Sequence, residues 1–95
     1  MNDLRFQWDP TKAATNLRKH RVSFDEAATV FDDPQWYFEE DIGHSDREDR
    51  FKAIGFSRKN RLLTVVYTNN DDAIRIISAD KAKAAEKAAY TKNLR

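Results

Sequence analysis

The stretch SFDEAATVFDDP, residues 23–34, predicts a short helix more clearly than any other part of the chain. Ser23 and Glu26 have the spacing of a capping box, in which the Ser23 hydroxyl accepts from the Glu26 amide and the Glu26 carboxylate reaches back to the Ser23 amide. Apolar side chains follow at helical spacing: Phe24, Ala27, Ala28 and Phe31. Asp32-Asp33-Pro34 then ends the helix, which is expected to bury one aromatic-edged stripe.

A strand and another helix are predicted before this segment. LRFQW, residues 4–8, alternates apolar and polar side chains as a half-buried strand does. Asp9-Pro10 then provides a helix cap and a favourable first helical residue. This helix is expected to run to about His20 and to bury Ala13 and Leu17.

From Gln35 onward the hydrophobic period changes from helical to extended. Strands are predicted at 35–40, 50–57, 61–68 and 73–79, with a polar loop at 42–49 and a last helix from about Asp80 to Asn93. The apolar face of that helix is mostly alanine, so weak docking is expected. The predicted fold is α+β, in the order β-α-α-β-β-β-β-α, with an antiparallel sheet packed against two N-terminal helices and a C-terminal helix. We interpret residues 1–95 as a single domain.

Composition excludes several classes of protein. The chain has 95 residues, no cysteine, and 17 lysine and arginine residues against 16 acidic ones, for a formal charge of +1. Disulfides and thiolate chemistry are therefore excluded. No apolar run approaches the roughly 20 residues of a membrane span, and the chain does not begin as a signal peptide does. We expect a cytoplasmic protein with no membrane partner.

The near-zero net charge hides an uneven distribution. Residues 1–38 carry five basic and six acidic side chains, residues 39–50 carry two and six, and residues 51–95 carry ten and four, so the local balances are −1, −4 and +6. The basic C-terminal half is compatible with a surface that binds nucleic acid or phosphate, because Lys and Arg displace counterions from a polyanion. Ordinary solvated charge is the alternative interpretation.

Motifs for metals and cofactors are missing from the sequence. The two histidines, His20 and His44, are 24 positions apart and have no cysteine near them, so no metal is expected. Two glycines cannot form a phosphate-binding loop, and no cofactor is predicted. Trp8 and Trp36 are open to two interpretations, stacking on RNA bases or packing in the core.

Several motifs, in this order and spacing, carry a family resemblance. They are Phe6-Gln7-Trp8-Asp9-Pro10-x-Lys12, Asn16-x-x-Lys19-His20-x-Val22-x-Phe24-x-Glu26-Ala27, Val30-Phe31-x-Asp33-Pro34, Arg50-Phe51 with Ile54-Gly55, Leu62-Leu63-x-Val65-x-Tyr67-Thr68 and Ile74-Arg75-Ile76-Ile77-Ser78-Ala79. From Phe6 to about Tyr90 the chain resembles the BrnT toxins of bacterial type II toxin–antitoxin systems. The resemblance implies a RelE-like fold, a ribonuclease that arrests translation, and inhibition by a BrnA antitoxin with a ribbon-helix-helix DNA-binding domain.

Two positions depart from the family pattern. Gln7 stands where members usually carry glutamate, and Asp80, followed by Lys81, stands where they usually carry a basic residue. If that basic side chain contacts phosphate, Lys81 must replace it or activity is reduced.

Metal-independent RNA cleavage through attack of the 2′-hydroxyl needs a base, cations around the phosphorane and an acid at the leaving oxygen. The residues we assign to catalysis are Lys19, His20, Arg61 and Arg75, and those we assign to RNA binding are Arg18, Arg21, Lys81 and Trp8.

The roles of individual site residues stay open at this point. His20 is the base, a phosphate-binding cation, or a helix-end residue that only interacts with the helix dipole. If it is not the base, Lys19 or Glu26 would replace it in that role. Arg75 either faces a cleft or meets a carboxylate in a buried ion pair. The weaker acid candidates are Tyr67 and Tyr90.

A second class of function fits the same basic surface, namely a non-catalytic module that binds RNA or an acidic protein. On the toxin hypothesis, the antitoxin should cover the face that carries Arg61 and Arg75. The free chain is also open to self-association as a homodimer.

Overall fold

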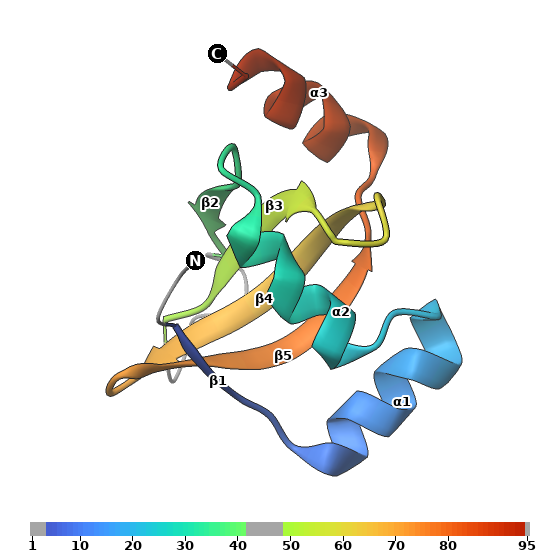
Figure 1. The fold of residues 1–95 in the computed structure, drawn as a ribbon, viewed down its shortest axis with the longest axis vertical. Coiled ribbons are helices and arrows are strands. Elements are labelled where there is room, and N and C mark those ends of the chain that lie inside the picture. Colours follow the sequence, from blue (N-terminus) through green and yellow to red (C-terminus); the bar gives the residue numbers. More distant parts are fainter. Residues whose placement is uncertain (1–3, 42–48, 95) are drawn as a thin grey trace.

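The computed structural model describes residues 4–41 and 49–94, which form a five-stranded sheet with helices around it (Figure 1). The elements in chain order are β1 (Arg5–Gln7), α1 (Pro10–His20), α2 (Phe24–Ala28), the 3-10 helix η1 (Thr29–Asp32), β2 (Tyr37–Glu40), β3 (Phe51–Phe56), β4 (Leu62–Asn70), β5 (Ala73–Lys81) and α3 (Ala84–Lys92). The α+β class is therefore confirmed. The predicted polar loop lies outside the described residues, apart from Asp49.

The strands lie in the order β1-β5-β4-β3-β2. Strands β2 to β5 pair antiparallel in chain order, but β1 pairs parallel with β5 and places Phe6 opposite Ile74. The expectation of a wholly antiparallel sheet is thus wrong for β1. Because α1 and α2 separate β1 from the next strand, no tight turn forces β1 to run antiparallel to a neighbour.

Strand β5 is longer than predicted. Asp80 pairs with Thr64 and Lys81 with Leu63, so the ladder continues where the last helix was expected to begin. The predicted helix start at Asp80 is therefore wrong, and α3 begins at Ala84. The β-branched run of β4 supplies pairing partners up to this point, and pairing overrides the helix propensity of the alanine-rich segment.

At the start of helix α2, one of the two hydrogen bonds of the predicted capping box is present. The Ser23 hydroxyl accepts from the Glu26 amide at 3.0 Å. The predicted return bond from the Glu26 carboxylate to the Ser23 amide is wrong, because this carboxylate turns inward to Ser57 and Arg61. A bidentate ion pair with a guanidinium is stronger than a single bond from a carboxylate to a backbone amide, which explains the choice.

The hydrophobic core lies between the sheet and the layer formed by α2 and η1. Its fully buried larger side chains include Val22, Phe24, Val30, Leu63, Val65 and Ile76. Aromatic rings extend the core toward β2, since Phe31 contacts Trp36 and Tyr67 at centroid distances of 4.8 and 5.3 Å. Gly55 permits this close approach, because a Cβ there would lie 2.9 Å from the Trp36 Cβ.

Helix α1 covers the edge of β5 through Asn16. The Asn16 amide nitrogen donates to the carbonyl oxygens of Ala79 and Val22 at 2.9 Å each, and its oxygen accepts from the Ala79 amide at 3.0 Å. Asn16 is 5% exposed, whereas Leu17 is 49% exposed, so the predicted burial of Leu17 is wrong. A strand edge has backbone amides and carbonyls that need hydrogen-bond partners, so the polar Asn16 faces it instead of the apolar Leu17.

Helix α3 attaches to the sheet through polar contacts. The buried Tyr90 donates its hydroxyl proton to Asp33 Oδ2 at 2.6 Å. Glu86 accepts from the Thr64 hydroxyl and from the Lys83 amide, both at 2.8 Å. The Tyr90 ring also packs against the Phe56 ring, so α3 is held by these polar contacts together with an aromatic one.

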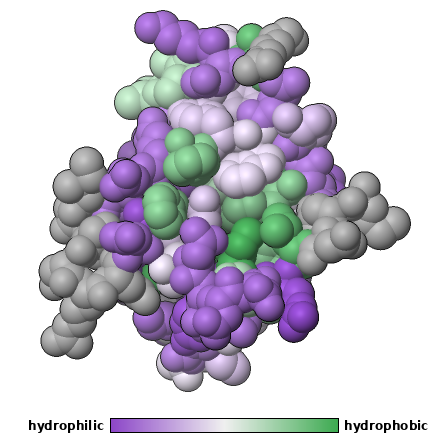
Figure 2. Space-filling model, turned by 90° about the vertical axis from the view of Figure 1, so that its left-hand side faces the viewer, coloured by the Kyte–Doolittle hydropathy of each residue, from purple (hydrophilic) through white to green (hydrophobic). Residues whose placement is uncertain are grey.

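The side of the molecule that carries β2 shows hydrophobic side chains gathered between hydrophilic ones (Figure 2). Phe38 in β2 is 58% exposed and packs edge-on against Phe51 at a centroid distance of 5.8 Å. β2 is an edge strand of the sheet. Phe38 therefore lies at an edge, outside the core.

We expect Asn16→Ala to lower the free energy of unfolding by ~3 kcal/mol, because it leaves buried Ala79 and Val22 backbone groups without partners. The adjacent Leu17→Ala, at an exposed position, should change it by ~0.5 kcal/mol or less. Urea unfolding of both variants measures the difference. Equal losses would contradict the edge-capping role of Asn16.

Candidate functional site

A pocket of about 480 Å³ lies at the end of the sheet where β4 begins and β5 ends. We call it the Arg61 pocket. It is lined by Phe56, Arg61, Leu62, Lys81, Lys87, Tyr90 and Thr91. Its lining has three cationic side chains and no carboxylate, so it is suited to an anion.

Glu26 holds the Arg61 guanidinium in place. Arg61 Nε donates to Glu26 Oε2 at 2.9 Å, and Nη2 donates to Glu26 Oε1 and to the Arg21 carbonyl oxygen, the latter at 3.0 Å. Glu26 also accepts from the Ser57 hydroxyl at 2.6 Å. The third guanidinium nitrogen, Nη1, takes part in none of these bonds.

Both members of this pair are charged. The hydrogen bond from Arg61 holds the pKa of Glu26 below its ordinary value, although burial of the carboxyl group opposes this. The bond to Glu26 in turn raises the pKa of Arg61. The Glu26 side chain is 2% exposed and that of Arg61 is 30% exposed, so the carboxylate is inside the protein and the cation reaches its surface.

His20 lies close to this end of the sheet, at the end of α1. Its Nδ1 is 3.3 Å from Asp80 Oδ2, and the next residue, Arg21, provides the carbonyl that Arg61 binds. Lys19 and His20 line a separate hollow of about 260 Å³ between α1 and β5. Arg18 is exposed on the last turn of the same helix. The structure therefore gathers most of the predicted cations at one end of the molecule.

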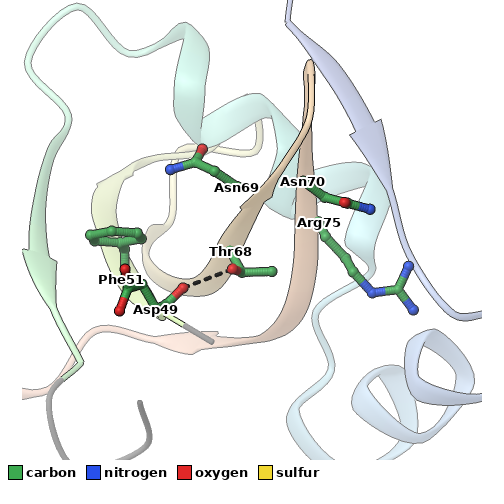
Figure 3. A pocket seen from close by; sticks show the side chains of 6 residues that line it. All are labelled: Asp49, Phe51, Thr68, Asn69, Asn70 and Arg75. Carbon is green, nitrogen blue, oxygen red and sulfur yellow. Dashed lines mark hydrogen bonds between the residues drawn. The ribbon is translucent and has the colours of Figure 1, made fainter. Parts of the chain in front are cut away.

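Arg75 lies elsewhere, in a pocket of about 460 Å³ that includes Asp49, Phe51 and Thr68 (Figure 3). Its guanidinium points away from the hydrogen bond that Thr68 donates to the Asp49 carbonyl oxygen at 2.7 Å. Among the described residues Arg75 forms no salt bridge, so the cleft alternative holds and the buried-pair alternative does not.

The structure does not place Arg75 beside Arg61. Arg75 pairs with Thr68, which follows Arg61 by seven positions along the strand, and at about 3.3 Å per residue the two sites are roughly 20 Å apart. In the described part of the chain, the two arginines therefore do not share a single cleft.

Trp8 is half-buried and packs edge-on against Phe24 at a centroid distance of 5.9 Å, away from the Arg61 pocket lining. Burial raises the pKa of Tyr67. Burial and the bond to Asp33 raise the pKa of Tyr90 to about 12. Both tyrosines therefore hold their protons more firmly than tyrosine in water, which makes them weaker acids.

Sequence reasoning missed Phe56 and Lys87 as lining residues. Lys87 and Tyr90 are three positions apart and lie on neighbouring turns of one helix face, and this spacing was a usable signal. Phe56 stands at a strand end, where its exposure depends on how α3 docks, so no local pattern indicates it.

Within residues 4–41 and 49–94, no group of three or more histidine or acidic side chains could hold a metal ion. His44 lies outside the described residues. None of the helices described is long and apolar enough to cross a membrane.

Fold and site together define a class, a small α+β domain with a cationic pocket at one end of its sheet. The chain matches the family model of the ribonuclease toxin BrnT of type II toxin–antitoxin systems over residues 8–86, and it belongs to this family. A toxin of such a system has an antitoxin partner.

The fold is similar to the crystal structure of the Brucella abortus ribonuclease toxin BrnT. The TM-score is 0.64 at 20% sequence identity, and the match covers 84% of this chain and 97% of the other. Among curated proteins, no sequence matches the chain.

Acid should destabilise the fold through Glu26. Because the folded-state pKa of Glu26 is lowered, its contribution to stability is full above its ordinary value of 4.5 and is lost as the pH falls through the folded-state value. Glu26→Gln should therefore be less stable at neutral pH and lose less stability on acidification, as urea unfolding at a series of pH values measures. Asp25→Asn, at an exposed neighbour, should keep the wild-type pH dependence.

Proposed function

We propose that this chain is a metal-independent endoribonuclease that cleaves RNA by attack of a 2′-hydroxyl on the adjacent phosphate, with the Arg61 pocket as the phosphate site. One observation carries the proposal. A buried carboxylate orients Arg61 and leaves Nη1 unused beside two lysines, in a lining without acidic groups. Family membership supports ribonuclease activity.

The pocket supplies what the phosphorane needs. Negative charge develops on the phosphoryl oxygens in the transition state, and preorganised cations stabilise it without reorganising. Arg61 is fixed in advance by Glu26, while Lys81 and Lys87 add mobile charges. The pair with Glu26 is thus part of the proposed catalytic apparatus as well as of the fold.

We assign the base to His20. His20 lies at the same end of the sheet as the Arg61 pocket, with Nδ1 3.3 Å from Asp80 Oδ2. In a neutral ring that carries its proton on Nδ1, Nε2 can take the proton of the 2′-hydroxyl. The products are then a 2′,3′-cyclic phosphate and a 5′-hydroxyl, whose oxygen needs a proton. Lys19 next to His20 is our candidate for this acid. Glu26 is a poor alternative base because it is buried and bound to Arg61.

Arg75 we assign to a second contact with the RNA backbone, roughly 20 Å from the cleavage site along the sheet. An extended strand that crosses the sheet would meet both cationic sites, and Arg18 and Arg21 would contact phosphates beside the first. Arg75→Ala should then weaken RNA binding and reduce its salt dependence by about one phosphate contact.

Regulation follows from the family. We propose that the antitoxin is of the BrnA type, with a ribbon-helix-helix domain, and that it inhibits by covering the Arg61 end of the sheet. Cleavage of cytoplasmic RNA by the free toxin would arrest translation. A complex that leaves the Arg61 pocket open would contradict this mode of inhibition.

The central test is digestion of single-stranded RNA in EDTA. Arg61→Lys keeps the positive charge but loses the bidentate pair with Glu26 that orients it. Cleavage should therefore fall at least ~100-fold. Arg61→Ala is a poorer choice, since removing one partner of a buried ion pair costs ~3–5 kcal/mol of stability. Arg58→Lys in the adjacent turn, where the side chain is 77% exposed, is the matched control and should cleave normally. Urea unfolding verifies that each variant is folded.

Three results would overturn the proposal: full activity in folded Arg61→Lys, loss of activity in EDTA, or RNA binding without cleavage. The last result would indicate a binding module.

His20→Gln should bind RNA normally and cleave it ~100-fold or more slowly, because the proton acceptor is removed. Only an unprotonated imidazole can accept this proton, so wild-type cleavage should be faster at higher pH than at lower pH. Single-turnover cleavage rates at a series of pH values measure both effects. Cleavage by His20→Gln at the wild-type rate would transfer the base assignment to Lys19.

A further inference from the structure

Phe56, at the end of β3, is a large apolar side chain that the fold leaves 41% exposed. Its backbone amide donates to Asp33 Oδ2 at 2.8 Å, and its ring meets the Tyr90 ring edge-on at a centroid distance of 5.5 Å. Tyr90 is held in turn by its own bond to Asp33. Phe56 is therefore both exposed and fixed, which suits an aromatic platform better than a loosely packed surface residue.

The rest of the Arg61 pocket complements this ring. Leu62 adds an apolar wall, and Arg61, Lys81 and Lys87 bring positive charge. A volume of about 480 Å³ is in the range of small-ligand sites. The lining thus combines a flat apolar surface with cations, and a nucleotide combines a flat base with a phosphate in the same way.

We propose that Phe56 stacks one unpaired nucleobase of the RNA, so that the Arg61 pocket takes a single nucleotide of a single-stranded substrate. The proposal rests on the proposed function in that its ligand is RNA. A base inside a duplex is already stacked on both faces and cannot reach Phe56, so double-stranded RNA is excluded.

A peptide ligand fits the same wall less well. An extended peptide binds largely through main-chain hydrogen bonds to an exposed edge. Here the Phe56 amide already donates to Asp33, and the Leu62 carbonyl oxygen already accepts from the Ala82 amide at 2.9 Å. Base stacking needs none of these groups, and this favours RNA over an acidic segment of a protein.

The test uses single-stranded oligonucleotides with 2′-O-methyl groups, which cannot be cleaved by 2′-hydroxyl attack, and with 2-aminopurine placed at each position in turn. Binding to the wild type should quench the fluorescence at one position. Phe56→Leu keeps an apolar side chain without an aromatic face, and should abolish that quenching and weaken affinity about 5- to 150-fold at fixed salt. Phe56→Trp should preserve both.

Phe38→Ala is the matched control, because Phe38 is also exposed at 58% and lies on β2, outside the pocket lining. It should bind and quench as the wild type does. Thermal unfolding shows whether each variant keeps its fold. If Phe56→Leu unfolds, binding and quenching are measured on Phe56→Trp instead.

The proposal is overturned if Phe56→Leu binds and quenches normally, if Phe38→Ala loses as much affinity, or if a duplex of the same sequence competes equally. Binding of an acidic antitoxin segment, and of no oligonucleotide, to this pocket would also overturn it. Failure of the cleavage proposal is separately visible, because stacking is measured here without any cleavage. Phe56-dependent quenching without nuclease activity would leave the stacking site in place and remove the catalytic assignment.

Discussion

A carboxylate that the fold removes from water determines how one end of this molecule is built. Glu26 is buried while ionised, and a buried charge destabilises a protein strongly unless it is paired and hydrogen-bonded. Arg61 and Ser57 satisfy it, and Arg61 continues to the Arg21 carbonyl oxygen. One network thus connects the end of α1, the start of α2 and the turn before β4. The Arg61 pocket has a fixed cation because Glu26 needs one.

Two other polar side chains, the buried Asn16 and the half-buried Asp33, also hold parts of the fold together through several hydrogen bonds each. Asn16 completes the hydrogen bonds of the β5 edge, and Asp33 accepts from the amides of Gln35 and Phe56 and from the Tyr90 hydroxyl. Burial alone would raise the pKa of Asp33, but these three hydrogen bonds lower it. Specific polar contacts therefore fix how the helices meet the sheet.

The sequence predicted those features that depend on neighbouring residues. The Asp9 cap, the Ser23 cap and the β-branched run of β4 are local, and the elements they predict are present. Features that depend on distant partners were wrong or missed: the direction of the Glu26 side chain and the exposure of Leu17. In the site, the charges of Arg61 and Lys81 were visible in the sequence, but the contribution of Phe56 depends on where α3 docks.

Asp80 and Lys81 are consecutive residues of β5 with different neighbours. Asp80 places a carboxylate 3.3 Å from His20, while Lys81 lines the Arg61 pocket. His20 thus has an acidic neighbour, and the Arg61 pocket has a further cation, from two consecutive residues of one strand. The carboxylate of Asp80 stays out of the pocket lining, so positive charge is concentrated where phosphate is proposed to bind.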